Sequence, residues 1–130
     1  MKCVILGAVT GGIENSKEIF EAYKNILQAK ADIIGTPLDT AVFKGTHRER
    51  FERAEAMIRE ADLVIADLSS ISTGAGIELG IAHILGKKIS VFAKRDSNVS
   101  GLAIGMLGDG SINYYENLDD LKNQLANYGV

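Results

Sequence analysis

Glu78 is the residue in this sequence whose type and position are best suited to chemistry. It follows an apolar run at residues 63–66, the carboxylate of Asp67 and a polar loop, and it opens a helical pattern of isoleucines spaced one turn apart. The loop between the two carboxylates consists of small residues, among them Ser69, Ser70, Ser72, Thr73, Gly74 and Gly76. Open α/β sheets carry their ligand sites at the carboxyl ends of strands, so a strand, a small-residue loop and a helix predict a site here.

Both carboxylates also have a simpler interpretation. Glu78, placed in the first turn of the predicted helix, could complement the helix dipole, an effect worth ~0.3–1 kcal/mol. The glycines two and four residues before it favour a ligand site instead. Asp67 could contact a substrate, or it could end its strand by hydrogen-bonding nearby amides, and the second interpretation is slightly favoured.

A second strand, loop and helix unit begins the chain. Residues 2–7 form a continuous apolar run, typical of a strand buried on both faces, and Gly7, Gly11 and Gly12 follow in a small-residue loop. Asn15 or Ser16 can cap the next helix. The loop lacks the glycine spacing of a dinucleotide-binding fingerprint and the Gly-Lys-Ser/Thr of a P-loop. Free N–H groups at helix N-termini favour an anion, so we expect a phosphate near residues 72–76 or near Gly11 and Gly12.

The remaining pattern predicts the fold. Further strands are expected at residues 32–35, 89–92 and 112–115, and helices at 47–60, within 101–110 and after a cap at Asn117. Residues 36–47 resemble a loop, stopped from continuing the strand by Pro37, and could form a pocket wall or lid. Strands that alternate with helices indicate an α/β, five-stranded, parallel, doubly wound sheet with helices on both faces, in the flavodoxin-like order 2-1-3-4-5. In that order the loops after Gly7 and Asp67 face each other across one crevice.

Composition restricts the class of protein. The 130 residues are expected to form one domain, 1–130, with 46% hydrophobic and 24% charged residues. A net charge of −3 without a basic tract disfavours nucleic acid as a partner, and no apolar run approaches the ~18 residues needed to span a membrane. The single Cys3 favours the cytoplasm. His47 and His83 lie far apart without a ligand at metal-binding spacing, so neither a metal nor a cofactor is expected.

Residues 61–80, reading A-D-L-V-I-A-D-L-S-S-I-S-T-G-A-G-I-E-L-G, resemble the signature of the nucleoside 2-deoxyribosyltransferase family. The pattern is most similar to that of its small members, the 2′-deoxynucleoside 5′-phosphate N-hydrolases. The matching positions are Ser72, Gly74, Gly76, Glu78, Leu79 and Gly80, and the first loop matches more weakly.

The resemblance implies a mechanism and a site. Glu78 would attack the anomeric carbon and expel the nucleobase, leaving a glycosyl-enzyme ester that water hydrolyses. Ser72 would bind the 5′-phosphate, since the transferases carry an acid at this position and a hydroxyl does not repel phosphate. The other implied substrate-binding residues are Gly7, Ala8, Val9, Thr10, Gly11, Gly12, Asp67, Gly74 and Gly76. A homodimer is implied as well, with Ser100 or Gly101 of the neighbouring subunit completing the phosphate site.

The sequence departs from the family at four positions, two of them Ala8 and Thr10 of the first loop, where the hydrolases carry serine and arginine. Val4 stands where the hydrolases carry a tyrosine, and Ala54 where they carry an aspartate that orients the sugar. Nearby candidates for these roles are the hydroxyl of Tyr23, whose spacing also fits the core, and the carboxylates of Asp39, Glu52 and Glu55. The leading hypothesis is an N-glycosidase of (deoxy)nucleoside 5′-monophosphates. A nucleotide-binding module without turnover and a deoxyribosyltransferase are the alternatives, and the base and sugar stay open.

Overall fold

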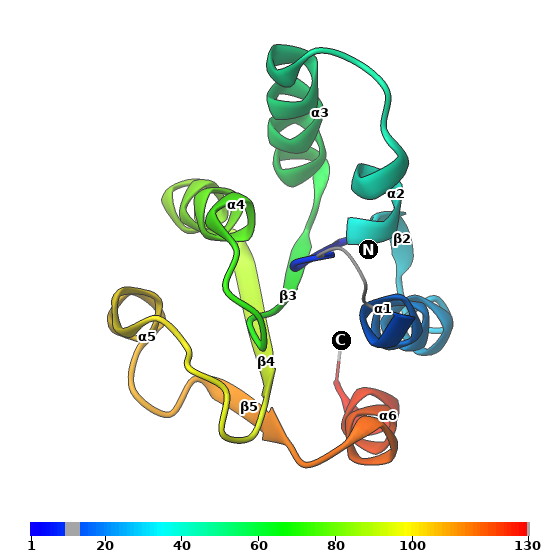
Figure 1. Cartoon of the computed structure of the whole chain (residues 1–130), viewed down its shortest axis with the longest axis vertical. Helices are drawn as coiled ribbons and strands as arrows, with labels where there is room; N and C mark the ends of the chain where they lie inside the picture. The colour runs from blue at the N-terminus through cyan, green and yellow to red at the C-terminus, as the bar shows by residue number, and fades with distance from the viewer. Residues whose placement is uncertain (10–13, 130) are drawn as a thin grey trace.

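The protein is built around one parallel β-sheet, seen edge-on between its helices in Figure 1. The computed structural model describes residues 1–9 and 14–129, with Glu14 and Asn15 described through their backbone alone. Within these residues the strands are β1 (Lys2–Leu6), β2 (Asp32–Gly35), β3 (Leu63–Asp67), β4 (Lys88–Lys94) and β5 (Ile112–Tyr115). They pair in the order β2-β1-β3-β4-β5, all parallel, as the sequence predicts.

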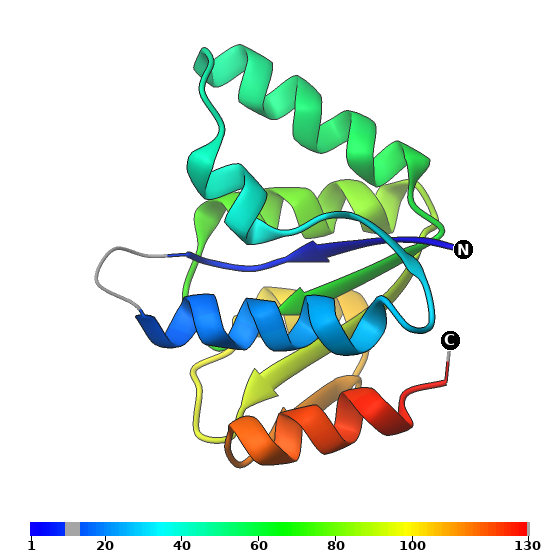
Figure 2. The same cartoon turned by 90° about the vertical axis from the view of Figure 1, so that its right-hand side faces the viewer.

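Helices cover both faces of the sheet (Figures 1 and 2). They are α1 (Glu14–Leu27), α2 (Pro37–Val42), α3 (His47–Glu60), α4 (Thr73–Ile84), α5 (Gly101–Leu107) and α6 (Leu118–Asn127). Helices α1 and α6 pack against one face, and α3, α4 and α5 lie on the other. No helix in the described ranges is long and apolar enough to cross a membrane.

The strand residues alternate between two hydrophobic cores. In β1, Cys3 and Ile5 face α1 and α6, whereas Val4 and Leu6 face α3 and α4. This alternation follows from the period of two in a β-strand, and burial on both faces explains the continuous apolar runs of β1 and β3.

The prediction of a loop at residues 36–47 is wrong for the first half of this segment, which forms helix α2. Thr36 caps this helix through a capping box with Asp39, and Pro37 occupies its first turn. Proline is favourable there, because its fixed φ suits a helix and its missing N–H needs no partner. Pro37 therefore ends the strand and also starts a helix.

Two predicted helix starts are also wrong. Helix α1 begins at Glu14, so Asn15 and Ser16 lie inside it. Helix α4 begins at Thr73 with Ser72 as its cap, which places Glu78 in the second turn and leaves no acidic residue in the first. Dipole effects fade beyond the first turn, so the dipole interpretation of Glu78 fails. The remaining helix starts, at His47 and after the cap Asn117, are confirmed.

Candidate active site

A cavity of about 230 Å³ opens at the carboxyl end of β1. Its floor is the end of β1 and the residues after it, and its walls come from α2, α3 and α4. The lining residues are Ile5, Leu6, Gly7, Val9, Pro37, Thr40, Ala41, Arg50 and Glu78. Because parallel strands deliver their carboxyl ends to one edge, this is the position at which the fold places a ligand.

Glu78 supplies the carboxylate of this cavity. It projects from the second turn of α4, and burial raises the pKa of its carboxyl from 4.5 to about 7. Among the described residues no side chain forms a hydrogen bond or an ion pair with it, so nothing offsets the desolvation of its charged form. A partly buried, unpaired carboxylate in a cavity is typical of a functional group.

Arg50 supplies the positive charge of the same cavity, a role that its sequence pattern does not indicate. The charges of α3 indicate a solvated face, and Arg50 is indeed exposed, but it lies in the first turn, where α3 meets the cavity. The one hydrogen bond of its side chain within the described ranges joins Nη2 to the carbonyl oxygen of Phe43 at 3.5 Å. The sequence feature that could have identified Arg50 is its position shortly after residues 36–47, the segment expected to form a pocket wall.

Gly7 is required at the cavity floor by close packing. A Cβ atom at this position would lie 2.3 Å from Cζ of Phe20 and 3.3 Å from the carbonyl oxygen of Asp67. Phe20 belongs to the core between α1 and the sheet, so it cannot withdraw freely. Gly7 thus lets the β1 backbone pass close to α1 and β3 beside the cavity.

Asp67 lies behind the cavity and does not line it. Its side chain is only 5% exposed, and its Oδ2 accepts hydrogen bonds from the hydroxyls of Tyr23 (2.7 Å) and Tyr115 (2.8 Å). Its Oδ1 accepts from the backbone N–H of Ser69 at 2.9 Å. Burial, and then the charge of Asp67, raise the pKa of both tyrosines, so both hydroxyls keep the protons that they donate. This geometry fits the hydrogen-bonded interpretation of Asp67, with two hydroxyls as partners beside one amide.

The Asp67 network explains both roles considered for Tyr23. Its ring is fully buried in the core between Phe20 and Phe92, and its hydroxyl is occupied by Asp67. It therefore offers no free hydroxyl to the cavity. Ser69 extends the network, since its Oγ lies 3.0 Å from the Tyr115 hydroxyl and accepts from the N–H of Lys94 at the end of β4.

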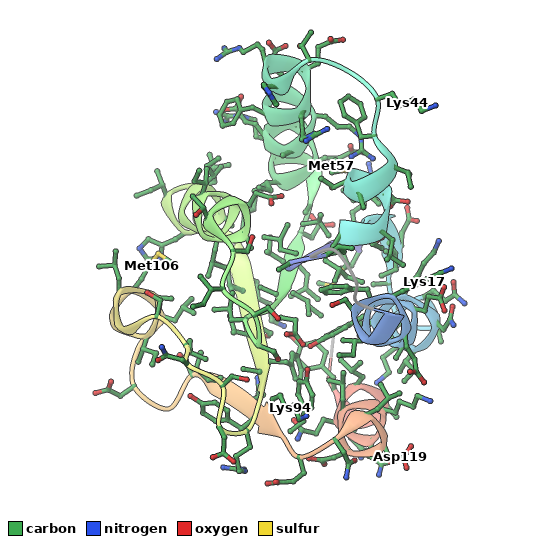
Figure 3. All side chains as sticks on the ribbon, viewed as in Figure 1. Lys17, Lys44, Met57, Lys94, Met106 and Asp119 are labelled. Atoms are coloured by element: carbon green, nitrogen blue, oxygen red, sulfur yellow. The ribbon has the colours of Figure 1, made fainter. Side chains whose placement is uncertain are left out.

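A second hollow, a groove of about 920 Å³, lies between α4 and α5. Ser72 and Gly76, predicted for the site, line it, and so do Ser100 and Gly101, which were predicted to complete the phosphate site of a neighbouring subunit. Each serine caps a helix, Ser72 accepting from the N–H of Ala75 at 3.1 Å and Ser100 from that of Ala103 at 3.4 Å. Figure 3 shows Met106 of α5 turned toward α4 across this groove.

The predicted site residues are therefore divided between two hollows. Gly7, Val9 and Glu78 line the cavity, whereas the serines and Gly76 line the groove. Ala8 is buried and Gly74 is exposed, and neither lines a hollow described here. Thr10, Gly11 and Gly12 lie outside the described residues.

The carboxylates considered as replacements for the aspartate do not line the cavity. Asp39 caps α2, and Glu52 and Glu55 pair with Arg48 (3.0 Å) and Arg59 (3.3 Å) of their own helix. Val4 is 1% exposed and packs in the core. Glu78 is thus the one acidic residue among those that line the cavity in the described part of the chain. The described part of the chain contains no group of three or more histidine, cysteine or acidic side chains that could hold a metal.

Comparison with known proteins places this arrangement in a family. The model of a family described as nucleoside 2-deoxyribosyltransferase matches residues 5–123. A search of curated proteins finds no match.

Solved structures share the fold. The CMP N-glycosidase BcmB of Clostridium botulinum superposes with a TM-score of 0.76 at 21% identity, covering 98% of this chain and 100% of that one. A 2-deoxyribosyltransferase of Leishmania mexicana gives a TM-score of 0.65 at 19% identity, covering 98% and 99%. That of Bacillus psychrosaccharolyticus gives 0.67 at 21% identity, covering 95% and 91%. By its family match and its five-stranded fold, this chain belongs to the nucleoside 2-deoxyribosyltransferase family.

Proposed function

We propose that the protein is an N-glycosidase that hydrolyses the N-glycosidic bond of (deoxy)nucleoside 5′-monophosphates, with Glu78 as the nucleophile. The observation that carries this proposal is the position of Glu78, a carboxylate in a cavity with its pKa raised by burial to about 7. Enzymes of this family act on the same bond, whether they hydrolyse it or transfer the sugar.

The chemistry follows from the poor solvation of Glu78. An oxygen of the ionised carboxylate attacks the anomeric carbon, and the bond to the nucleobase breaks with its electron pair leaving on the base. Positive charge develops on the sugar in this step, as in glycoside hydrolysis, and a carboxylate that water stabilises poorly gains most from approaching it. Water then cleaves the glycosyl ester and regenerates the carboxylate.

The phosphorylated substrate is proposed from Ser72. Its hydroxyl lies at the N-terminus of α4, a helix of 12 residues whose first N–H groups and dipole favour an anion. A hydroxyl accepts or donates to phosphate, whereas the acid found here in the transferases would repel it. Gly74, Gly76 and residues 10–12 complete the proposed phosphate site.

We propose a homodimer in which a second copy covers the face around the groove. Large apolar side chains are exposed there, namely Ile71 (82%), Ile77 (53%), Ile84 (83%) and Leu102 (87%). An apolar cluster of this kind on a surface marks an interaction site. Leu102→Glu should leave the fold intact and convert the dimer to a monomer in light scattering, whereas a wild type that runs as a monomer contradicts the proposal.

A cytoplasmic location is proposed on the chemistry of the single thiol. Cys3 is fully buried in β1, and burial raises its pKa to about 12, so it is suited to packing as a reduced thiol.

A nucleotide-binding module without turnover is the second candidate. It is favoured by Val4 and Ala54, at positions where the hydrolases carry a tyrosine and an aspartate, and by the engagement of Asp39, Glu52 and Glu55 elsewhere. Such a module would bind nucleotides and raise its melting temperature without releasing a base.

A nucleobase-release assay over ribo- and deoxyribonucleoside monophosphates tests the proposal. We expect base release by the wild type and its loss in Glu78→Ala, with Glu52→Ala as an exposed control on α3 that keeps activity. Adding a second free base separates hydrolysis from transfer, because a transferase forms a new nucleotide. A wild type that binds nucleotides without releasing base supports the binding module instead.

A further inference from the structure

The reaction proposed above leaves one requirement unmet by Glu78, which is stabilisation of the departing nucleobase. When the glycosidic bond breaks, the electron pair leaves on the base, and negative charge develops beside the former bond. Glu78 acts as the nucleophile in this step and cannot also donate a proton. No second acidic residue belongs to the cavity lining in the described ranges, so the described wall supplies no other acid for this step.

Arg50 is the cavity residue suited to this requirement. The other arginines of α3 are engaged: Arg48 with Glu52, Arg59 with Glu55, and Arg53 over the ring of Phe43 at 5.3 Å. Arg50 has only the long contact to the Phe43 carbonyl in the described part of the chain, although a guanidinium carries five N–H donors. Most of its donors therefore have no partner among the described residues and are open to a ligand in the cavity.

The position of Ser72 favours a base-binding role for Arg50 over a phosphate-binding one. Ser72 lies six residues before Glu78, which is about 9 Å along the axis of α4, and it lines the groove rather than the cavity. Arg50 lines the cavity on the side formed by α2 and α3, together with Pro37, Thr40 and Ala41 of α2. A nucleotide with its phosphate at Ser72 and its anomeric carbon at Glu78 directs its base toward the wall formed by α2 and α3.

We infer that Arg50 stabilises the departing base of a pyrimidine nucleotide by donating guanidinium N–H groups to its 2-oxo oxygen. This oxygen is attached next to the glycosidic nitrogen and takes up the developing charge, while a purine offers only a ring nitrogen there. The inference depends on the proposed function and specifies its substrate class.

The step balances without an acid from the protein. The bond between Glu78 and the anomeric carbon forms as the bond to the base breaks, and the base leaves as an anion paired with Arg50. An arginine stays protonated in proteins, so the base takes its proton from water. Removing one fixed donor from a developing negative charge lowers kcat by about 10²–10³-fold, which sets the effect expected for Arg50.

A leaving-group comparison tests this role. The substrates are UMP and dUMP and their 5-fluoro counterparts, because fluorine stabilises the base anion and reduces its need for Arg50. We expect Arg50→Gln to lower kcat on UMP or dUMP by about 10²–10³-fold and on the 5-fluoro substrate by at least about tenfold less. Arg50→Lys should be intermediate, since it keeps the charge without the fork of donors.

Arg48→Gln is the matched control, because it removes the same charge from the same turn of α3 at a residue paired with Glu52 and outside the cavity. It should retain wild-type rates, and unfolding midpoints of all variants should agree. An equal loss on both leaving groups, restricted to phosphorylated substrates, would assign Arg50 to the phosphate and overturn the inference. Unchanged rates in Arg50→Gln, or a wild type active on purine nucleotides alone, overturn it while the proposed function stands. A wild type that releases no base overturns both.

Discussion

Replacing Glu78 by glutamine should stabilise the protein, and the gain should depend on pH. Burial raises the pKa of Glu78 from 4.5 to about 7, so the folded protein holds this proton more tightly than the unfolded chain does. When folding raises the pKa of a carboxyl, its bound proton stabilises the folded state. This contribution is fully present below the unfolded-state pKa and is lost as the pH rises through the folded-state pKa. Above pH 7 the fold therefore contains a desolvated charge that glutamine removes without a large change in shape.

The magnitude follows from the two pKa values. Their difference, from 4.5 to about 7, at about 1.4 kcal/mol per pKa unit, gives about 3 kcal/mol in the free energy of unfolding at pH 8. For a chain of 130 residues this corresponds to a rise in Tm of about 10 °C. The gain should decline between pH 7 and 5 and be nearly gone at pH 4.5, below which the wild-type residue becomes protonated in both states.

Urea unfolding of wild type and Glu78→Gln between pH 4.5 and 8 measures this directly. Glu52→Gln provides the control, because Glu52 is an exposed partner of Arg48 and should change stability by no more than about 1 kcal/mol at any pH. A Glu78→Gln gain that is the same at pH 5 and pH 8 would refute the electrostatic explanation. A wild type more stable than the variant at pH 8 would show that a partner compensates the charge.

Three further predictions test the site and its support. The kcat/KM for base release should rise with pH and level off with an apparent pKa near 7, since only ionised Glu78 attacks; a flat pH profile would contradict this. Tyr115→Phe should lower the free energy of unfolding by about 1.5–3 kcal/mol, because buried Asp67 loses a hydroxyl donor at 2.8 Å. A change below about 0.5 kcal/mol in urea unfolding would mean that the Asp67 network does not stabilise the fold. Gly7→Ala should destabilise the protein by about 1–3 kcal/mol, because the new Cβ clashes with Phe20. Gly76→Ala should stabilise an isolated protomer by about 0.5–1 kcal/mol, because its Cβ meets no atom within 4 Å. Equal effects of the two substitutions in thermal unfolding would refute this distinction.

The sheet could be predicted because its signals are local and repeated. Apolar runs such as that of β1 alternate with amphipathic helices, and right-handed crossovers leave few orders for five parallel strands. Glu78 could be found because it follows a strand and a run of small residues. Its exact turn could not, because glycines at 74 and 76 indicate a loop, while the Ser72 cap extends the helix through them.

The parts that the sequence did not predict depend on tertiary contacts. Arg50 looks like its neighbours on α3, and only the fold, which brings this turn of α3 to the cavity that α2 also lines, distinguishes it. The sequence also did not indicate that Glu78 lines the cavity whereas Ser72 lines the groove. Asp67 was recognised as a strand end, but its two tyrosine partners come from α1 and β5, far away in the chain.

The central claim is that Glu78 forms a covalent bond to the sugar during base release. The most direct measurement is mass spectrometry of the acid-quenched enzyme after rapid mixing with a nucleotide that it hydrolyses, followed by mapping of the modified peptide. We expect a sugar-phosphate adduct on Glu78 in the wild type, formed as fast as base is released, and no adduct in Glu78→Gln. Base release that continues in Glu78→Gln, or an adduct on another residue, would contradict this account.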